Sequence, residues 1–174
     1  MQADQSLPFR KTAKNLVFGE GSLNPKIYIL GEAPGRTEDE TGQPFVGRSG
    51  KFLRELITSI GFDPLKDVYI TSVVRFRPPE NKTPTPKQVA AYEKYINLEL
   101  QIIKPKLIVT VGGVSLKKFS REPITKIHAK PMQVSWLGAR FTLVPMFHPA
   151  AALRNPAIKR AMIRDFQKLK ALVK

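Results

Sequence analysis

The chain has 174 residues, of which 42% are hydrophobic and 25% are charged, a composition that is typical of a globular domain and excludes a disordered chain. Its 29 Lys and Arg residues against 14 Asp and Glu residues give a net charge of +15, which favours a polyanion such as DNA or RNA as partner. The absence of cysteine excludes disulfides and thiolate metal sites, and two histidines argue against zinc. No apolar run approaches the roughly 20 residues that span a bilayer, so we expect no membrane partner.

The first 26 residues are polar and irregular. We predict that they form an N-terminal arm packed on a single domain that comprises residues 1–174. The expected anchors of this arm are its larger apolar side chains, namely Phe9, Val17 and Phe18.

Beyond the arm, apolar β-branched runs alternate with segments of helical periodicity. The predicted strands are residues 27–30, 68–74, 107–111 and 141–146. The predicted helices are residues 51–60, 87–103, a short segment ending near 119, and 157–173. Residues 31–50 and 75–86 are predicted loops, and residues 120–140 show little pattern. Such alternation predicts an α/β fold with a mainly parallel sheet.

Two polar turns follow predicted strands directly. Gly31-Glu32-Ala33-Pro34-Gly35 comes after the first strand, and His148-Pro149-Ala150 comes after the last. Open α/β sheets place their sites beyond the carboxyl ends of the strands, so we expect the two turns to meet. The first offers a carboxylate and backbone N–H groups to a phosphate or a base carbonyl, although Gly-Pro turns of this kind are also common structural features.

Other side chains suggest nucleic-acid contacts. Phe45 lies in a loop where it can stack on a base, or it anchors the core. His148 is held extended by the following proline and can donate to a carbonyl that gains charge, or it is structural. The basic residues among the loop prolines and after the His148 turn suit backbone phosphates, or they form a solvated charge run: Arg75, Arg77, Lys82, Arg154 and, as an amide, Asn155.

Taken together in order and spacing, these segments resemble the family 4 uracil-DNA glycosylases over residues 15–170. The matching elements are Val17-Phe18-Gly19-Glu20-Gly21, Gly31-Glu32-Ala33-Pro34-Gly35, Glu38-Asp39, Pro44-Phe45-Val46-Gly47, Val68-Tyr69-Ile70-Thr71, Arg77-Pro78-Pro79, His148-Pro149-Ala150 and Leu153-Arg154-Asn155-Pro156.

The resemblance implies an α/β/α sandwich around a four-stranded parallel sheet, and an enzyme that flips uracil or a related deaminated base out of DNA and hydrolyses its N-glycosidic bond. It implies that Glu32 and His148 are catalytic, with His148 bonded to uracil O2, and that Phe45 stacks on the base while Gly31, Ala33 and Ser72 help to bind it. It further implies a monomer that acts on single- or double-stranded DNA in the cytoplasm of a prokaryote, associated with the nucleoid.

The chain departs from the family pattern at its cluster ligands. Family members hold a four-iron, four-sulfur cluster on four cysteines, and those positions fall near Asp4, Leu7, Phe76 and Tyr92 here. We therefore predict no cluster and no other cofactor. Phe76 and Tyr92 are expected to pack together and to hold the same loop by apolar contact.

A second departure lies at Ser72, where the family carries an asparagine that reads uracil O4 and N3–H. A hydroxyl cannot present the same pair of contacts. Two alternatives therefore stay open: a glycosylase with shifted specificity for hypoxanthine or xanthine, and a DNA-binding protein without catalysis. The combined set of motifs disfavours a third, an unrelated phosphate-binding enzyme. Because three alanines follow His148-Pro149, Leu153 is the expected wedge that enters the DNA stack.

Overall fold

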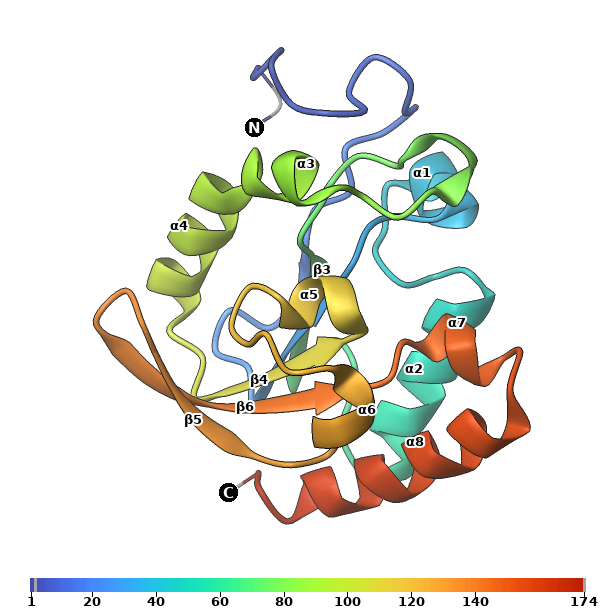
Figure 1. The fold of residues 1–174 in the computed structure, drawn as a ribbon, viewed down its shortest axis with the longest axis vertical. Helices are drawn as coiled ribbons and strands as arrows, with labels where there is room; N and C mark the ends of the chain where they lie inside the picture. The colour runs from blue at the N-terminus through green and yellow to red at the C-terminus, as the bar shows by residue number, and fades with distance from the viewer. Residues whose placement is uncertain (2, 174) are drawn as a thin grey trace.

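The computed structural model describes residues 1 and 3–173, which surround a central sheet of six strands in the order β1-β3-β2-β4-β6-β5 (Figure 1). The four inner strands β3 (Val68–Ser72), β2 (Ile27–Gly31), β4 (Leu107–Val111) and β6 (Ala139–Met146) are parallel. The short edge strands β1 (Glu20–Gly21) and β5 (Met132–Trp136) are antiparallel to their neighbours. The prediction of a four-stranded sheet is therefore wrong in number, because it describes only the parallel centre.

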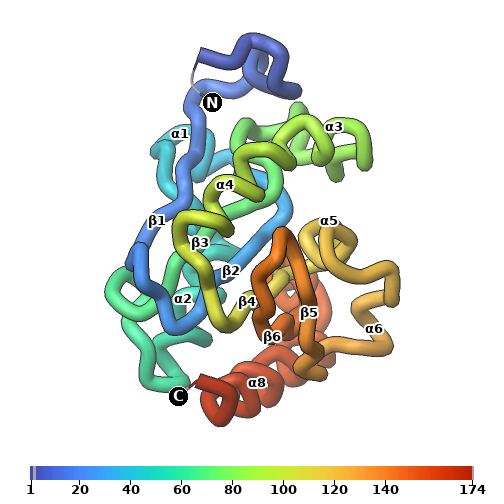
Figure 2. The backbone as a smooth tube through the Cα atoms, turned by 90° about the vertical axis from the view of Figure 1, so that its left-hand side faces the viewer, coloured from blue at the N-terminus to red at the C-terminus, as the bar shows by residue number. Residues whose placement is uncertain are grey.

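Helices cover both faces of this sheet (Figures 1 and 2). Strand residues point alternately to opposite faces, so Ile27 and Ile29 pack against α2 (Arg48–Ser59) and α8 (Pro156–Lys170). Tyr28 and Leu30 pack on the other face, against α4 (Glu93–Ile103). Each face carries its own hydrophobic cluster. No helix in the described part of the chain is long and apolar enough to cross a membrane.

Several short elements lie where the sequence pattern predicts loops or one continuous helix. They are α1 (Arg36–Thr41), η1 (Pro79–Asn81), α6 (Ile124–Ile127) and α7 (Pro149–Ala152). The short helix predicted to end near residue 119 is confirmed as α5 (Gly113–Leu116). The helix predicted over residues 87–103 is two helices, α3 (Pro86–Ala90) and α4. Thr85 caps α3, accepting the Gln88 N–H, and the helix breaks before Tyr92, whose ring turns into the core. Elements of three to six residues carry too little periodicity to be predicted from sequence.

The N-terminal arm contributes the edge strand β1 and packs through Val17, which is buried. Phe9 is partly buried against the α4 face of the sheet. The prediction that Phe18 anchors the arm is wrong, because this side chain is 54% exposed. The carboxylate of Asp39 in α1 holds the arm instead, accepting the N–H groups of Lys14 and Asn15 at 2.9 and 3.1 Å.

The four positions at which the resemblance places cluster ligands hold a different kind of contact. Leu7, Phe76 and Tyr92 are buried in one hydrophobic cluster, as the prediction for the aromatic pair expected. The Tyr92 hydroxyl donates to the carbonyl of Pro8 and also bonds the backbone of Phe76, so it joins the arm to the loop after β3. Asp4 accepts bonds from Lys94 and Tyr95. One carboxylate and three apolar or aromatic side chains do not fit an iron–sulfur cluster, which needs thiolate ligands.

Because Phe76 fills the space between the arm and α4, we expect Phe76→Ala to lower the free energy of unfolding by about 3–5 kcal/mol. Phe18→Ala is the matched control, since it removes the same ring from an exposed position and is expected to change the free energy by less than about 0.5 kcal/mol. Urea unfolding followed by circular dichroism measures both. Equal, small effects would mean that the aromatic contact does not hold the arm.

Candidate active site

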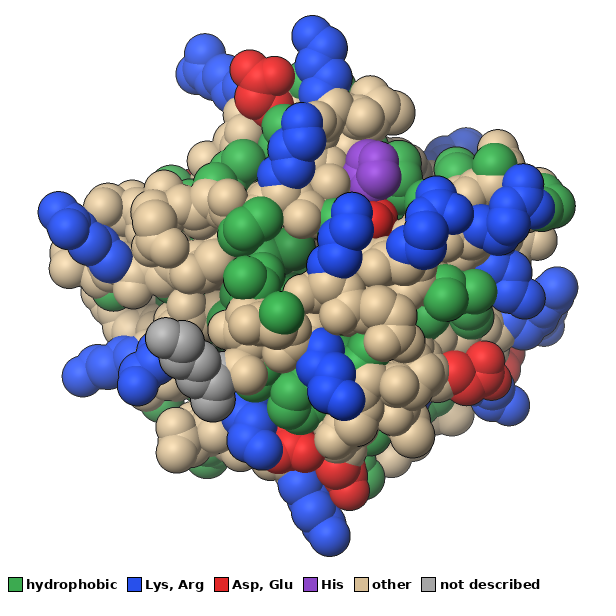
Figure 3. Space-filling view, turned by 90° about the horizontal axis from the view of Figure 1, so that it is seen from below, with side chains coloured by type: hydrophobic (Ala, Val, Ile, Leu, Met, Phe, Trp, Pro, Cys, Tyr) green, Lys and Arg blue, Asp and Glu red, His purple; other side chains and the backbone are tan. Residues whose placement is uncertain are grey.

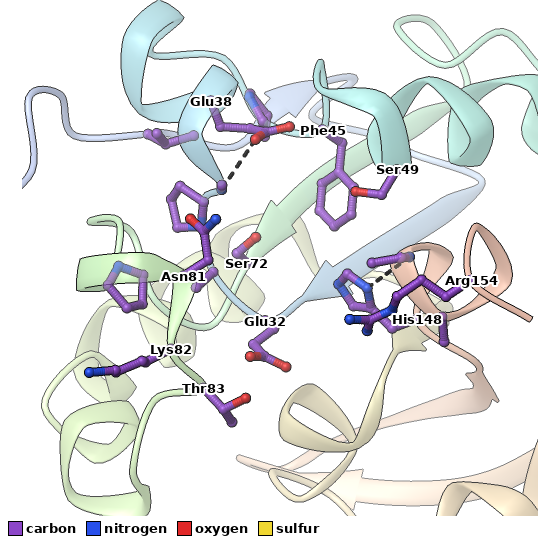
Figure 4. A pocket seen from close by; sticks show the side chains of 18 residues that line it. Glu32, Glu38, Phe45, Ser49, Ser72, Asn81, Lys82, Thr83, His148 and Arg154 are labelled. Atoms are coloured by element: carbon purple, nitrogen blue, oxygen red, sulfur yellow. Dashed lines mark hydrogen bonds between the residues drawn. The ribbon is translucent and has the colours of Figure 1, made fainter.

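The parallel register brings the ends of three strands to one edge of the sheet. Gly31 at the end of β2 pairs with Ser72 at the end of β3, and β6 ends at Met146, two residues before His148. A cavity of about 530 Å³ opens at this edge (Figure 4). It is lined by the turn after β2, the end of β3, the 78–83 loop and the His148 turn. The two turns that the sequence singled out therefore do meet.

Glu32 projects into this cavity, between Thr83 and the His148 turn (Figure 4). Burial removes water from its carboxylate and raises the pKa of Glu32 above its ordinary value, because the charged form loses hydration. A hydrogen bond from the Thr83 side chain acts in the opposite direction. The result is a carboxylate that accepts a proton more readily than one in water.

His148 faces Glu32 across the cavity, beside Arg154 (Figure 4). Its Nδ1 accepts the N–H of Ala150 at 3.1 Å, which makes His148 the N-cap of α7. Burial and, to a smaller extent, the positive charge of Arg154 lower the pKa of His148 to about 4, while the negative charge of Glu38 opposes the shift. The imidazole is therefore neutral near pH 7. Since Nδ1 is an acceptor, the ring proton lies on Nε2, which can donate.

Phe45 contributes an aromatic wall to the cavity and is 7% exposed. Its backbone is left-handed, with φ of +53°. Gly31, which is predicted to help bind the base, does not line the cavity itself. It leaves room for the Phe45 ring, because a Cβ at Gly31 would lie 2.3 Å from Phe45 Cζ. Ala33 does line the cavity.

Ser72 lines the cavity from β3 and is buried. Asn81, which sequence analysis missed, also lines the cavity, from the loop that contains η1 (Figure 4). Its amide oxygen accepts the Arg77 Nε–H at 2.8 Å, and its φ is +55°, a conformation that asparagine tolerates better than most residues. The only sequence signal for a role of Asn81 in the site is its position shortly after Pro78 and Pro79, in a loop that follows a strand. Ser49 and Thr83 also line the cavity, and no sequence pattern indicated that they would.

The predicted phosphate contact of Arg75 is wrong. This side chain is 2% exposed, and its Nη2 donates to both oxygens of Glu99 at 2.9 and 3.0 Å. Beyond β3 the Val73 N–H still donates to the Gly31 carbonyl, and the Arg75 side chain reaches Glu99 of α4. The hydroxyls of Tyr28 and Tyr69 donate to the same carboxylate.

The other predicted DNA contacts divide between the cavity and its surroundings. Lys82 and Arg154 line the cavity. Arg77 and Leu153 lie outside it, and Leu153 is 39% exposed. Asn155 caps α8, because its side-chain oxygen accepts the N–H groups of Ala157 and Ile158 at 2.9 and 3.4 Å.

Comparison with known proteins assigns the chain that forms this cavity to a family. The profile of the Uracil DNA glycosylase superfamily matches residues 18–170. This chain belongs to that superfamily. It is 40% identical over 172 residues to the Type-4 uracil-DNA glycosylase of Thermotoga maritima, with 96% of this chain and 88% of the relative covered. The Type-4 enzymes of Saccharolobus solfataricus and Archaeoglobus fulgidus are 39% and 38% identical, over 92% and 91% of this chain and 77% and 82% of their own lengths. The resemblance found in the motifs is therefore confirmed for membership of the superfamily and for similarity to its Type-4 enzymes.

The environment of His148 predicts its titration. Nuclear magnetic resonance of the imidazole should show a pKa near 4, well below the ordinary 6.5, because burial and Arg154 both oppose the charge. Arg154→Ala should raise the pKa of His148, because it removes one of the two effects that lower this pKa. The unfolded chain binds this proton at higher pH than the folded one, so the stability contributed here falls as pH drops from about 6.5 to 4. A His148 pKa at or above 6.5 would contradict this description of the site.

Proposed function

We propose that this chain is a single-domain DNA glycosylase that hydrolyses the N-glycosidic bond of uracil, or of a related deaminated base, in DNA. The observation that carries the proposal is the combination of groups around one cavity. Neutral His148 offers a donor, Glu32 offers a half-buried carboxylate, and Phe45 offers an aromatic face. The names of the relatives support the same activity.

The substrate base must leave the DNA stack to reach this cavity. Enzymes that act on a base flip its nucleotide into a pocket and recognise the base there by stacking and hydrogen bonds. Phe45 supplies the stacking surface, and the backbone at Ala33 lies at the same wall. The polar groups that face the base edge are Ser72, Asn81 and His148.

Bond cleavage separates charge in a way that these groups match. When the C1′–N1 bond breaks, its electron pair leaves with the base and is shared with O2, while the sugar becomes cationic. The Nε2–H of His148 stabilises the negative charge at O2, and the Glu32 carboxylate stabilises the positive sugar. Water then adds at C1′, and Glu32, whose pKa is raised, accepts its proton. The products are the free base and an abasic site.

Base recognition differs from the family pattern at Ser72. The short hydroxyl gives one contact where an amide gives two. Asn81 brings an amide to the same wall from the 78–83 loop, so we propose that it shares the reading of the base edge with Ser72. Arg77 holds this amide by donating to its oxygen.

The DNA backbone is expected to lie across the mouth of the cavity. Lys82 and Arg154 are placed there to neutralise phosphates, and Arg77 extends the same side. Leu153 is the proposed wedge, because it is exposed directly after α7. The net charge of +15 favours binding to single- or double-stranded DNA. We further propose a monomer that works on the nucleoid DNA of a prokaryote, the kind of organism in which these relatives occur.

The test of the proposal is a base-release assay on oligonucleotides that carry uracil, hypoxanthine or xanthine. We expect uracil to be released under single-turnover conditions. His148→Ala should slow cleavage by roughly a hundredfold or more with little change in DNA affinity, because a donor to the departing base is lost. Phe45→Ala should weaken binding of the flipped base by roughly 1–3 kcal/mol. DNA binding without release of any base would favour a damage-binding protein instead.

Ser72→Asn tests the reading of the base edge. The added amide should raise uracil excision by about threefold to tenfold, which is the value of one net hydrogen bond of about 0.5–1.5 kcal/mol. Selectivity over hypoxanthine should rise with it. Single-turnover rates on U·G, U·A and single-stranded uracil provide the measurement, and Ser72→Ala is the control for loss of the hydroxyl. A slower Asn variant, together with a loss in Asn81→Ala, would mean that Ser72 and Asn81 form a complete reader by themselves.

A further inference from the structure

Phe45 occupies a conformation that a bulky residue does not adopt freely. Its φ of +53° lies in the left-handed region, where a side chain with a Cβ crowds its own backbone. Strain of this kind persists only where the surrounding structure enforces it. The contacts on either side of Phe45 must therefore hold the loop in place.

On the N–H side of the loop, the holding group is the carboxylate of Glu38, which is 8% exposed. Its Oε1 accepts the N–H groups of Val46 and Gly47 at 3.0 and 2.7 Å. Its Oε2 accepts the N–H of Gly35 at 3.1 Å. One carboxylate thus ties the loop after Phe45 to the turn that carries Glu32.

On the carbonyl side, the holding group is the guanidinium of Arg54 in α2. Its Nε donates to the Phe45 carbonyl at 3.0 Å, and its Nη2 donates to the Pro44 carbonyl at 2.9 Å. Nη2 also pairs with Glu20, which fixes the guanidinium from the far side. The peptide groups before and after Phe45 are therefore held by two charged side chains of opposite sign.

Glycines allow these contacts to be close. A Cβ at Gly35 would lie 2.8 Å from Glu38 Oε2, and one at Gly47 would lie 3.1 Å from Oε1. A Cβ at Gly50 would lie 2.1 Å from the carbonyl carbon of Phe45. The loop is confined by side-chain charge on two sides and by close backbone packing against α2.

We propose that Glu38 and Arg54 are positioning residues, which hold Phe45 in its left-handed conformation and keep its ring in register with Glu32. The inference rests on the proposed function, in which Phe45 stacks on the flipped base. Neither residue needs to touch the substrate, because each acts through the loop it binds.

Glu38→Gln is the sharpest variant, because it keeps the size of the side chain and replaces one accepting oxygen with a donor. Glu40→Gln is the matched control, since it removes the same charge from the same helix at an exposed ion pair with Arg36. We expect Glu38→Gln to slow single-turnover excision by about tenfold to a hundredfold, the cost of a small displacement in a site. Affinity for undamaged DNA should stay unchanged, and Glu40→Gln should stay within twofold in both measurements. Similar losses in both variants would overturn the proposal.

A double-mutant cycle separates this role from a merely structural one. If Glu38 acts through Phe45, adding Glu38→Gln to Phe45→Ala should cost little more than Phe45→Ala alone. Independent, multiplying losses would contradict the proposal. Arg54→Lys repeats the test from the carbonyl side and keeps its charge, but an ammonium cannot reproduce the two-pronged contact of the guanidinium. It carries the test if Glu38→Gln fails to fold.

Amide hydrogen exchange provides a measurement that does not depend on activity. In Glu38→Gln, the amides of Gly35, Val46 and Gly47 should exchange faster, while the amides of the central strands should keep their protection. Unchanged exchange at these three amides would overturn the proposal. This outcome can be read even if the wild-type chain releases no base, so a failure of the positioning role is distinguishable from a failure of the proposed function.

Discussion

Parallel pairing of β2 with both β3 and β4 is the constraint on which the site depends. Because the strands run in the same direction, everything that follows their carboxyl ends must emerge at one edge. The pairing of Gly31 with Ser72 sets Glu32 one residue beyond a buried hydroxyl, and the parallel β6 delivers His148 to the same edge. Helices pack their apolar sides against both faces of the sheet. Polar groups from distant parts of the chain therefore converge at this edge.

Four acidic side chains of this protein make contacts inside the fold. Glu38, Asp39 and Asp165 are buried, and the first two bind backbone N–H groups. The Glu99 carboxylate pairs with Arg75 and accepts hydrogen bonds from two tyrosines on the α4 face of the sheet. Exposed basic side chains are spread over the face shown in Figure 3. Because basic residues outnumber acidic ones by 29 to 14, the net charge of +15 favours binding to a phosphate backbone.

The parallel strands and their meeting edge could be predicted from sequence, because long apolar runs and the turns after them are strong local signals. The burial of Arg75 could not be predicted, because its position next to a proline-rich segment suggested a solvated loop. In the structure the side chain points inward and pairs with Glu99. Asn81 and Glu38 depend on where loops return in space, which no local pattern records. Gly31 was predicted as a substrate contact, but its role is to leave room for Phe45. The roles that sequence reasoning predicts least well are those of residues that contact segments distant in the sequence.

Burial drives the two main ionisable groups of the cavity toward their neutral forms. It lowers the pKa of His148 and raises that of Glu32, because each charged form loses water. The neutral His148 donates from Nε2 to the base, and the Glu32 carboxylate responds to the positive charge that cleavage creates on the sugar. The basic residues that attract DNA stay at the rim, where water screens them. The same removal of water that shifts the pKa of both groups also strengthens their electrostatic action on the transition state.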